Sequence, residues 1–395
     1  MERNTPKLGT LAVWAGEEQP LWEGSTQVPV VHSVSYGYTD LDEWIGVAKG
    51  ERPGHIYSRN TNPTVGAFEQ KVAVLEGAES VTSFSTGMAA ISNTLYTLLS
   101  RGDRVVSIKD TYGGTTKLFL DFLPPLGIEV TLCATDDYDE IEREIAKGCK
   151  LVYLESPTNP TLKVLDLERF SAAAHAVGAT VVVDNTFATP INSRPLSLGA
   201  DLVIHSATKF LGGHADALGG VVCGTKSLVE RIYHYREING ATLHPMSAYL
   251  LLRGMKTLHL RIRQQNESAL VMAKFLQGHP AIDTVFYPGL PEHPHHDVAA
   301  RQMSGFGGVL SFTLKGGLPS VGKLISKLRF AHAAANLGSV ETVVGPPVTT
   351  SHVENTPQER ALMGIPEGML RYSIGIEDID DLIADLSGAL EYAQS

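Results

Sequence analysis

The chain has 395 residues, more than one ordinary hydrophobic core holds, so we expect a large domain and a smaller one. Its composition, 43% hydrophobic and 19% charged, is typical of a globular protein, and its net charge of −11 argues against a broad nucleic-acid-binding face. Charged residues near the N-terminus exclude a signal peptide, the apolar runs are too short to span a membrane, and the three scattered cysteines indicate neither a disulfide framework nor a zinc site, so we expect a cytoplasmic protein.

The opening stretch, up to about residue 60, is rich in Gly, Pro and Ser and is expected to be irregular. Beyond it, short β-branched runs alternate with amphipathic ones. The runs that we expect to form buried strands lie at residues 104–108, 151–154, 180–183 and 201–204. Residues 139–146 and 167–176 between them have apolar side chains at helical spacing. This alternation predicts an α/β fold with a mostly parallel sheet flanked by helices.

The last third of the chain predicts a smaller α/β domain. Residues 246–276 are expected to form one long helix or a broken pair, which connects the two domains. Residues 307–314 alternate in the manner of a strand, and residues 380–393 are expected to form a closing helix.

Two of the predicted strands end in residues of complementary chemistry, Asp184 and Lys209. Both side chains would emerge at the carboxyl edge of a parallel sheet, where such folds bind ligands. Pyridoxal 5'-phosphate (PLP) needs such a pair, a lysine for the Schiff base and an acid that keeps the pyridine nitrogen protonated. Ser206 and Thr208 add hydroxyl groups suited to a phosphate. Taken alone, an Asp and a Lys at strand ends are commonplace, and most such pairs are surface or salt-bridge groups.

Three further motifs would complete such a site. Residues 86–90 begin a helical pattern whose first N–H groups can bind phosphate, although small residues also begin ordinary helices. Tyr112 lies in a Gly-rich turn and can stack on a cofactor ring, or can be a half-buried loop tyrosine. Asn159 lies in a loop fixed by two prolines, within reach of the phenolic oxygen of the cofactor.

Seven motifs occur along the chain, at residues 57–64, 85–90, 112–115, 155–160, 183–186, 205–209 and 370–371. In this order they resemble the Cys/Met-metabolism family of PLP enzymes, which includes cystathionine synthases and lyases, methionine γ-lyases and homoserine-ester sulfhydrylases. The resemblance covers nearly the whole chain. It implies the fold of a fold-type I PLP-dependent transferase, with residues 1–60 as an arm that contacts a neighbouring subunit, 61–250 as the PLP-binding domain and 251–395 as the domain that binds the substrate carboxylate.

The resemblance also implies a role for each matching residue. Lys209 is similar to the Schiff-base lysine, Asp184 to the partner of the pyridine nitrogen, and Tyr112 to the ring-stacking residue and candidate acid–base. Arg371 matches the clamp for the α-carboxylate of an amino-acid substrate, for which a planar bidentate donor is suited. The other implied contacts to cofactor are Gly87, Met88, Asn159, Thr186, Ser206, Thr208, Tyr57 and Arg59, and those to substrate are Asn336 and Tyr57. No metal ion is expected.

Tyr57 and Arg59 match residues that reach the phosphate of a neighbouring subunit, which implies at least a dimer, and in this family usually a homotetramer built as a dimer of dimers. Trp14, Trp22 and Trp44, all near the N-terminus, are interpreted as interface residues. The histidine-rich residues 293–297 are interpreted as a structural turn.

The chain departs from the best-known family members at three positions. Gly114 stands where methionine γ-lyases usually have Cys, Ala335 where cystathionine enzymes commonly have Glu, and Asn336 where those enzymes have Ser. Without that Glu, a substrate with a distal ammonium group is disfavoured. Asn336 and residues 349–352 are more similar to homoserine-ester sulfhydrylases, whereas residues 214–216 are nearer to lyases and synthases.

The interpretation that we favour from the sequence is γ-elimination, that is, cleavage of the Cγ–S or Cγ–O bond of a methionine-, homocysteine- or canavanine-like amino acid. The alternative is γ-replacement on an O-acylhomoserine, as in an O-succinylhomoserine sulfhydrylase or a cystathionine γ-synthase. Both reactions use the same catalytic residues, so the motifs do not decide between them. An aminotransferase on the same general fold is disfavoured by the set of motifs.

Overall fold

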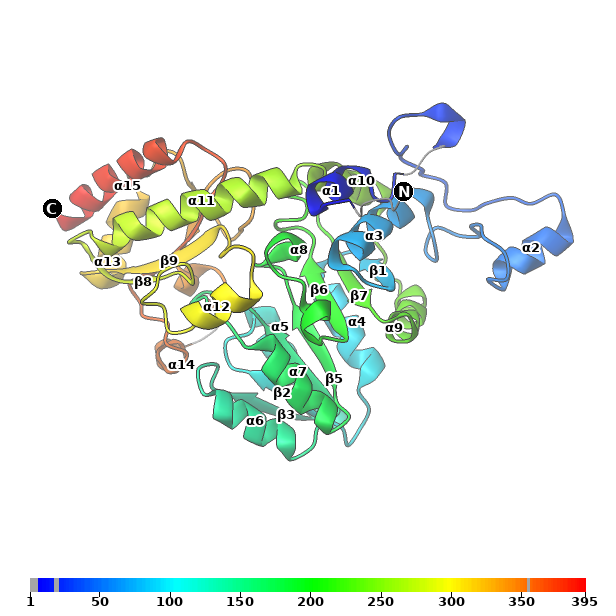
Figure 1. Cartoon of the computed structure of the whole chain (residues 1–395), viewed down its shortest axis with the longest axis horizontal. Helices are drawn as coiled ribbons and strands as arrows, with labels where there is room; N and C mark the ends of the chain where they lie inside the picture. Colours follow the sequence, from blue (N-terminus) through cyan, green and yellow to red (C-terminus); the bar gives the residue numbers. More distant parts are fainter. Residues whose placement is uncertain (1–5, 18–20, 354–355) are drawn as a thin grey trace.

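The computed structural model describes residues 6–17, 21–353 and 356–395, which form two sheets covered by helices (Figure 1). Helix α11 (Leu258–Gln277) runs along the part of the molecule that carries the smaller sheet. Among the described residues, no helix is both long and apolar enough to cross a membrane.

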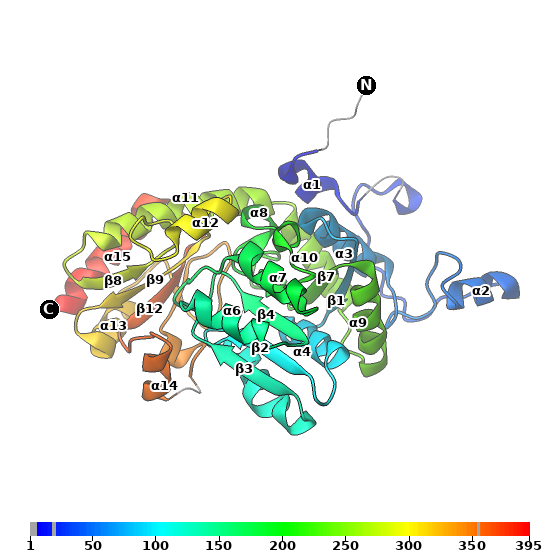
Figure 2. The ribbon, with the colours of Figure 1, turned by 60° about the horizontal axis from the view of Figure 1, so that its bottom comes forward.

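The expectation of an irregular stretch before residue 60 is wrong in part. It contains the helices α1 (Leu8–Trp14) and α2 (Leu41–Ala48) and the short turn η1 (Trp22–Gly24). Asp40 caps α2 by accepting a hydrogen bond from the backbone N–H of Glu43, a start signal that the Gly and Pro content conceals. Helix α2 extends away from the body of the molecule in both views (Figures 1 and 2).

The larger sheet has seven strands in the order β1-β7-β6-β5-β4-β2-β3. Its strands are β1 (Ser80–Phe84), β2 (Arg104–Ile108), β3 (Glu129–Cys133), β4 (Leu151–Glu155), β5 (Thr180–Asp184), β6 (Leu202–Ser206) and β7 (Gly220–Gly224). All neighbours pair in parallel except β7, which is antiparallel to β1 and β6. The four strands predicted from β-branched runs are confirmed as β2, β4, β5 and β6, and the prediction of a mostly parallel sheet is confirmed with them.

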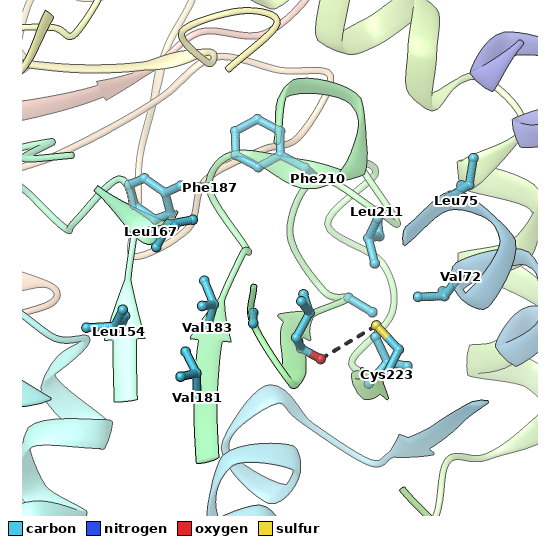
Figure 3. Packing of buried hydrophobic residues seen from close by; sticks show 14 of the residues in the cluster. Val72, Leu75, Leu154, Leu167, Val181, Val183, Phe187, Phe210, Leu211 and Cys223 are labelled. Atoms are coloured by element: carbon cyan, nitrogen blue, oxygen red, sulfur yellow. Dashed lines mark hydrogen bonds between the residues drawn. The ribbon is translucent and has the colours of Figure 1, made fainter. Parts of the chain in front are cut away.

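Helices cover both faces of this sheet, as its apolar strands require. Val181 and Val183 point to the face of α3 (Pro63–Glu76), α6 (Tyr138–Ala146), α7 (Leu167–Ala176) and α10 (Pro245–Met255). Val182 points to the face of α4 (Gly87–Leu98) and α9 (Lys226–Asn239). Figure 3 shows part of the first layer, where Val72 and Leu75 of α3 lie near Cys223 of β7. The predicted helices at 139–146 and 167–176 are confirmed as α6 and α7.

The smaller sheet has the order β10-β11-β12-β9-β8 and is antiparallel except between β10 and β11. Its strands are β8 (Ile282–Phe286), β9 (Val309–Leu314), β10 (His332–Ala333), β11 (Val343–Gly345) and β12 (Met369–Ser373). Helices α11, α13 (Gly317–Ile325) and α15 (Ile379–Gln394) pack on one of its faces. The predicted strand within 307–314 and the closing helix are confirmed, and the predicted connection is the broken pair α10 and α11.

The remaining short elements are α5 (Gly113–Lys117), η2 (Leu118–Phe122), η3 (Pro124–Leu126), α8 (Thr189–Asn192), η4 (Pro195–Leu198), α12 (His296–Gln302), η5 (Pro347–Thr349) and α14 (Pro357–Leu362). Of the histidine-rich residues 293–297, the first three form the predicted turn, and His296 and Asp297 begin α12. His295 stacks on Tyr138 with 5.4 Å between ring centroids, and its Nδ1 accepts a hydrogen bond from the Val164 N–H.

Candidate functional site

A cavity of about 260 Å3 lies at the carboxyl ends of β4, β5 and β6 and contains most of the predicted site residues. Residues from both sheets line it. They are Thr86, Gly87, Met88, Ile91, Tyr112, Glu155, Asn159, Asp184, Thr186, Phe187, Ser206, Thr208, Lys209, Leu218, Ala335, Leu337, Thr350, Ser351 and Arg371. The carboxyl ends of parallel strands meet at one edge of a sheet, which explains how motifs far apart in the sequence converge here.

Lys209 follows β6, and its Nζ donates a hydrogen bond to Asn336 Oδ1 at 2.7 Å. Burial, together with the nearby charge of Arg371, lowers the pKa of Lys209 to about 8. A lysine with this pKa has a larger neutral fraction near neutrality than an exposed one, as a nucleophilic amine requires. The turn after it is held by the buried Arg261, which donates to the carbonyl oxygens of Phe210 and Leu211 at 2.8 and 3.2 Å.

Asp184 ends β5 and is 7% exposed. Its carboxylate accepts hydrogen bonds from the Thr186 N–H at 3.0 Å and the Tyr153 hydroxyl at 3.4 Å. Burial raises the pKa of Asp184, and burial together with the charge of Asp184 raises the pKa of Glu155 well above its usual range. Two carboxyl groups confined in this way favour a ligand that brings a cationic N–H to them.

The N-terminus of α4 lies directly against the end of β6. Thr86 caps the helix, because its hydroxyl accepts a hydrogen bond from the Ala89 N–H at 3.0 Å. A Cβ at Gly87 would lie 2.8 Å from the Ser206 Cβ, so only glycine permits this approach. Thr208 on the same side exchanges hydrogen bonds with the Gly219 backbone. The first N–H groups of a helix have no partner within it, so α4 and the hydroxyl of Ser206 form a cradle for a phosphate.

Tyr112 precedes α5, and its backbone N–H donates to Glu155 Oε2 at 2.8 Å. Its side chain is 43% exposed in the single chain and borders the cavity. A Cβ at Gly114 would lie 2.8 Å from Met88 Sδ and 2.9 Å from the Tyr112 ring. The Cys that methionine γ-lyases usually have at this position would therefore displace one of these two side chains.

Arg371 projects into the cavity from β12 because side chains alternate between the two faces of this strand. Leu370 and Tyr372 on either side of it belong to the core of the small sheet, and successive side chains of a strand point to opposite faces. Arg371 is buried and donates to Asn159 Oδ1 at 3.0 Å and to the Asn336 carbonyl oxygen at 2.9 Å. Burial lowers its pKa to about 10, so the guanidinium remains a cation at neutral pH.

Asn336 does not line this cavity, although it binds both Lys209 and Arg371, and two further predicted site residues, Tyr57 and Arg59, lie apart from it. They border a separate hollow of about 350 Å3 together with His32, His244 and Pro245. The Arg59 guanidinium lies 5.6 Å from the Tyr57 ring centroid and donates to the Glu237 carbonyl oxygen. Within one chain these two residues are therefore apart from Lys209, and their role in a neighbouring subunit stays a prediction.

Sequence reasoning did not assign a role to several residues of the site. Tyr153, which donates to Asp184, lies in an apolar strand, and a buried tyrosine hydroxyl is itself a signal that a partner is near. Glu155 was part of a recognised motif, but its proximity to Asp184 follows from the pairing of β4 with β5. The apolar lining residues Ile91, Phe187 and Leu218 have no sequence signal of their own.

Comparison with known proteins places the chain among PLP enzymes. Residues 9–391 match the family described as Cys/Met metabolism PLP-dependent enzyme. The chain is 41% identical to an L-methionine gamma-lyase of Fusobacterium nucleatum, over 99% of this chain and 100% of that one. It is 40% identical to an O-succinylhomoserine sulfhydrylase of Pseudomonas aeruginosa, over 96% and 94%.

Among solved structures, a cystathionine gamma synthase from Xanthomonas oryzae in complex with aminoacrylate and cysteine is similar, with a TM-score of 0.94, 37% identity and 99% of both chains covered. The predicted fold, that of a fold-type I PLP-dependent transferase, is thereby confirmed.

The residues of the cavity fit PLP. The chain offers a buried amine of lowered pKa at Lys209, a buried acid at Asp184 for the ring nitrogen, and a helix N-terminus for the phosphate. A side chain larger than glycine at residue 87 would collide with Ser206, whose hydroxyl belongs to that cradle. These three groups come from separate elements, and only the fold brings them together.

Proposed function

The chain belongs to the Cys/Met metabolism PLP-dependent enzymes, and we propose that it catalyses γ-elimination from a 2-amino acid whose γ-substituent is uncharged, such as methionine or homocysteine. The members of this family are γ-lyases and γ-synthases of sulfur-amino-acid metabolism. The observation that carries the proposal is the distribution of charge in the cavity wall.

Among the described residues that line the cavity, the carboxylates are Glu155 and Asp184 and the cations are Lys209 and Arg371. The first pair and Lys209 lie where the cofactor is expected, and Arg371 is assigned to the substrate α-carboxylate. Among the described lining residues, no further charged side chain is left for a γ-substituent, and the same lining contains apolar residues such as Leu337. An uncharged thioether fits this wall better than a distal ammonium or carboxylate, which would lose solvation without gaining a partner.

The side chains of the site divide the steps of γ-elimination among them. Arg371 holds the α-carboxylate of the substrate with its planar fork, and Asp184 balances the charge on the cofactor ring. The Lys209 amine takes the Cα proton and then moves a Cβ proton, and Tyr112 gives a proton to the departing sulfur. PLP supplies an electron sink for the charge that develops at Cα. Hydrolysis by one water molecule completes the reaction, so the products are a 2-oxo acid, ammonia and the departing sulfur compound, which is a thiol from methionine and hydrogen sulfide from homocysteine.

Asn336 gives the site a feature that the sequence comparison did not predict. Its side chain holds the Lys209 amine, while its backbone carbonyl holds Arg371. We propose that Asn336 couples the position of the proton-transferring amine to that of the carboxylate clamp, in addition to the substrate contact that the resemblance implies.

The second candidate is γ-replacement on an O-acylhomoserine. Thr350 and Ser351 line the cavity, and Ser351 Oγ lies 2.9 Å from His352 Nδ1. These hydroxyls belong to the stretch that resembles homoserine-ester sulfhydrylases, and they can bind the ester oxygen atoms. The sulfhydrylase relative, at 40% identity, favours this candidate to the same degree as the γ-lyase relative favours elimination.

A substrate panel separates the two candidates. Purified enzyme receives methionine, homocysteine, cystathionine, canavanine, O-acetylhomoserine or O-succinylhomoserine, with and without sulfide or cysteine, and mass spectrometry identifies the products. The proposal expects turnover of methionine or homocysteine without any added nucleophile. Turnover only of an O-acylhomoserine together with a thiol would overturn it in favour of γ-replacement.

We also propose that the active enzyme is at least a dimer, and a homotetramer in its complete form. Its arm exposes Trp22 (68%) and Trp44 (45%), which suits burial against a second copy. Arg59→Ala and Lys209→Ala, each inactive alone, should regain partial activity when their subunits are mixed, because some mixed dimers contain one intact site. No recovery after confirmed subunit exchange would show that each site is built from a single chain.

A further inference from the structure

A buried polar cluster lies beneath the cavity, on the opposite face of the large sheet. Glu76, the last residue of α3, is 1% exposed. A single oxygen of its carboxylate, Oε1, lies 2.6 Å from His205 Nε2 and accepts a hydrogen bond from Asn185 Nδ2 at 2.9 Å. Neither this carboxylate nor this imidazole belongs to the lining of the cavity.

Each of the two partners of Glu76 is adjacent in the chain to a residue assigned to the cofactor. Asn185 directly follows Asp184, and His205 directly precedes Ser206. Successive side chains point to opposite faces of a strand, so Asn185 and His205 face α3 while Asp184 and Ser206 face the cavity. One carboxylate oxygen therefore ties together the ends of β5 and β6 at the places where the ring partner and the phosphate cradle emerge.

Backbone contacts extend this tie on both sides. The Asn185 N–H donates to the Ile204 carbonyl oxygen at 2.9 Å, and the Asn185 side chain also donates to the Ser193 carbonyl oxygen at 3.0 Å. On the cavity side, the Ser206 N–H donates to Thr186 Oγ1 at 2.9 Å. A shift of either strand end would break several of these bonds together.

The cluster is a poor way to stabilise a core. Among the described residues, Glu76 Oε2, Asn185 Oδ1 and His205 Nδ1 have no hydrogen-bond partner, and each such buried atom costs free energy. Val72 and Leu75 of α3 belong to the apolar core on this face of the sheet (Figure 3). An apolar cluster of similar volume would make the fold more stable. These polar side chains therefore have a role other than stabilising the core.

We propose that Glu76 is a positioning residue, which fixes Asp184 and Ser206 in their cofactor-binding geometry through Asn185 and His205. The inference rests on the proposed assignment of Asp184 and Ser206 to the cofactor.

The test compares variants of Glu76 with a matched control, Glu17, which contacts the same helix from outside it. Glu17 is also a buried carboxylate, 4% exposed, and it binds Lys71 of α3 at 2.7 Å, but it does not line the cavity. For each variant, apoenzyme is titrated with PLP to measure Kd from the absorbance of bound cofactor, and thermal unfolding of the apoenzyme is recorded in parallel.

Glu76→Ala should weaken PLP binding by about tenfold, because Asn185 and His205 both lose the carboxylate that they bind. Glu76→Gln should restore most of the affinity, since its amide oxygen can still accept. Glu17→Ala should lower the unfolding temperature and leave Kd unchanged. A wild-type Kd in Glu76→Ala, or equal weakening in Glu17→Ala, would overturn the inference.

If Glu76→Ala does not fold, His205→Leu and His205→Gln replace it, and only the Gln variant should keep the affinity of the wild type. Equal affinity in these two variants would equally overturn the inference. Asp184→Asn and Ser206→Ala test whether these two residues bind the cofactor at all. They therefore show whether a negative result rejects that assignment or only the role of Glu76. Normal PLP affinity in both would reject their assignment to the cofactor, whereas weak affinity in both with normal affinity in Glu76→Ala would reject only the role of Glu76.

Discussion

The large sheet and the small sheet contribute differently to the walls of the cavity. From the large sheet come Lys209, Asp184 and Glu155, which lie at or just beyond strand ends, with bonds to several neighbours. From the region of the small sheet come Ala335, which is exposed, and the residues around Thr350 near the turn η5, with Arg371 as the cation. We propose that the strand ends of the large sheet hold the catalytic groups, while the residues contributed from the region of the small sheet set which substrate the site accepts.

Lys209→Ala tests the large-sheet wall and should have the largest effect. Without the amine, neither covalent attachment of PLP nor proton transfer at Cα is possible, so turnover should fall by about 10³-fold or more. Absorbance of the holoenzyme and product formation measure the two losses. Lys163→Ala, which removes a lysine paired with Asp110 at 3.0 Å outside the cavity, should keep both, and full activity of Lys209→Ala would end the assignment.

Arg371→Lys tests the charged side chain that the described part of the small sheet contributes to the cavity lining. Lysine keeps the positive charge but lacks the planar fork that binds a carboxylate with two hydrogen bonds, so KM should rise by about ten- to a hundredfold. Cofactor absorbance should not change, because Arg371 is assigned to the substrate alone. An unchanged KM, or loss of the cofactor, would mean that Arg371 does not serve as the carboxylate clamp.

Ala335→Glu tests whether the residues near the small sheet determine which substrate the enzyme prefers. A carboxylate at this position would provide a partner for the distal ammonium of cystathionine, and the ratio of kcat/KM for cystathionine over methionine should rise by about ten- to a hundredfold. Ala335→Gln, of similar size but neutral, is the control and should change the ratio little. If wild-type enzyme already strongly prefers cystathionine, a different residue recognises the far end of the substrate.

The two walls also differ in how well the sequence predicted them. Lys209 and Asp184 follow β-branched runs that identify their strands without tertiary information, and the pairing of β4 with β5 and of β5 with β6 brings their ends together. The bond from Lys209 to Asn336 joins residues 127 positions apart and depends on how the two sheets pack against each other. No local pattern encodes such a contact, and the same holds for the cluster around Glu76.

The smallest effect that we predict concerns the pH dependence of Lys209, where Asn336 from the region of the small sheet contacts the lysine amine. Its pKa of about 8 means that neutral amine, the form that reacts with PLP, accumulates as pH rises through that value and is lost below it. The rate at which apoenzyme captures PLP, followed by absorbance, should therefore rise through about pH 8 and then level off, well below the value of about 10.4 for an ordinary lysine. A rate that still rises above pH 9 would contradict this.

Two variants should move that midpoint in opposite directions, by about one pH unit or less. Asn336→Ala removes an acceptor that favours the charged ammonium, so the midpoint should fall to lower pH. Arg371→Met removes a neighbouring positive charge that disfavours the ammonium, so the midpoint should move to higher pH. Shifts of the same sign in both variants would mean that burial alone controls this amine, and that the small-sheet wall contributes to substrate recognition but not to the reactivity of the lysine.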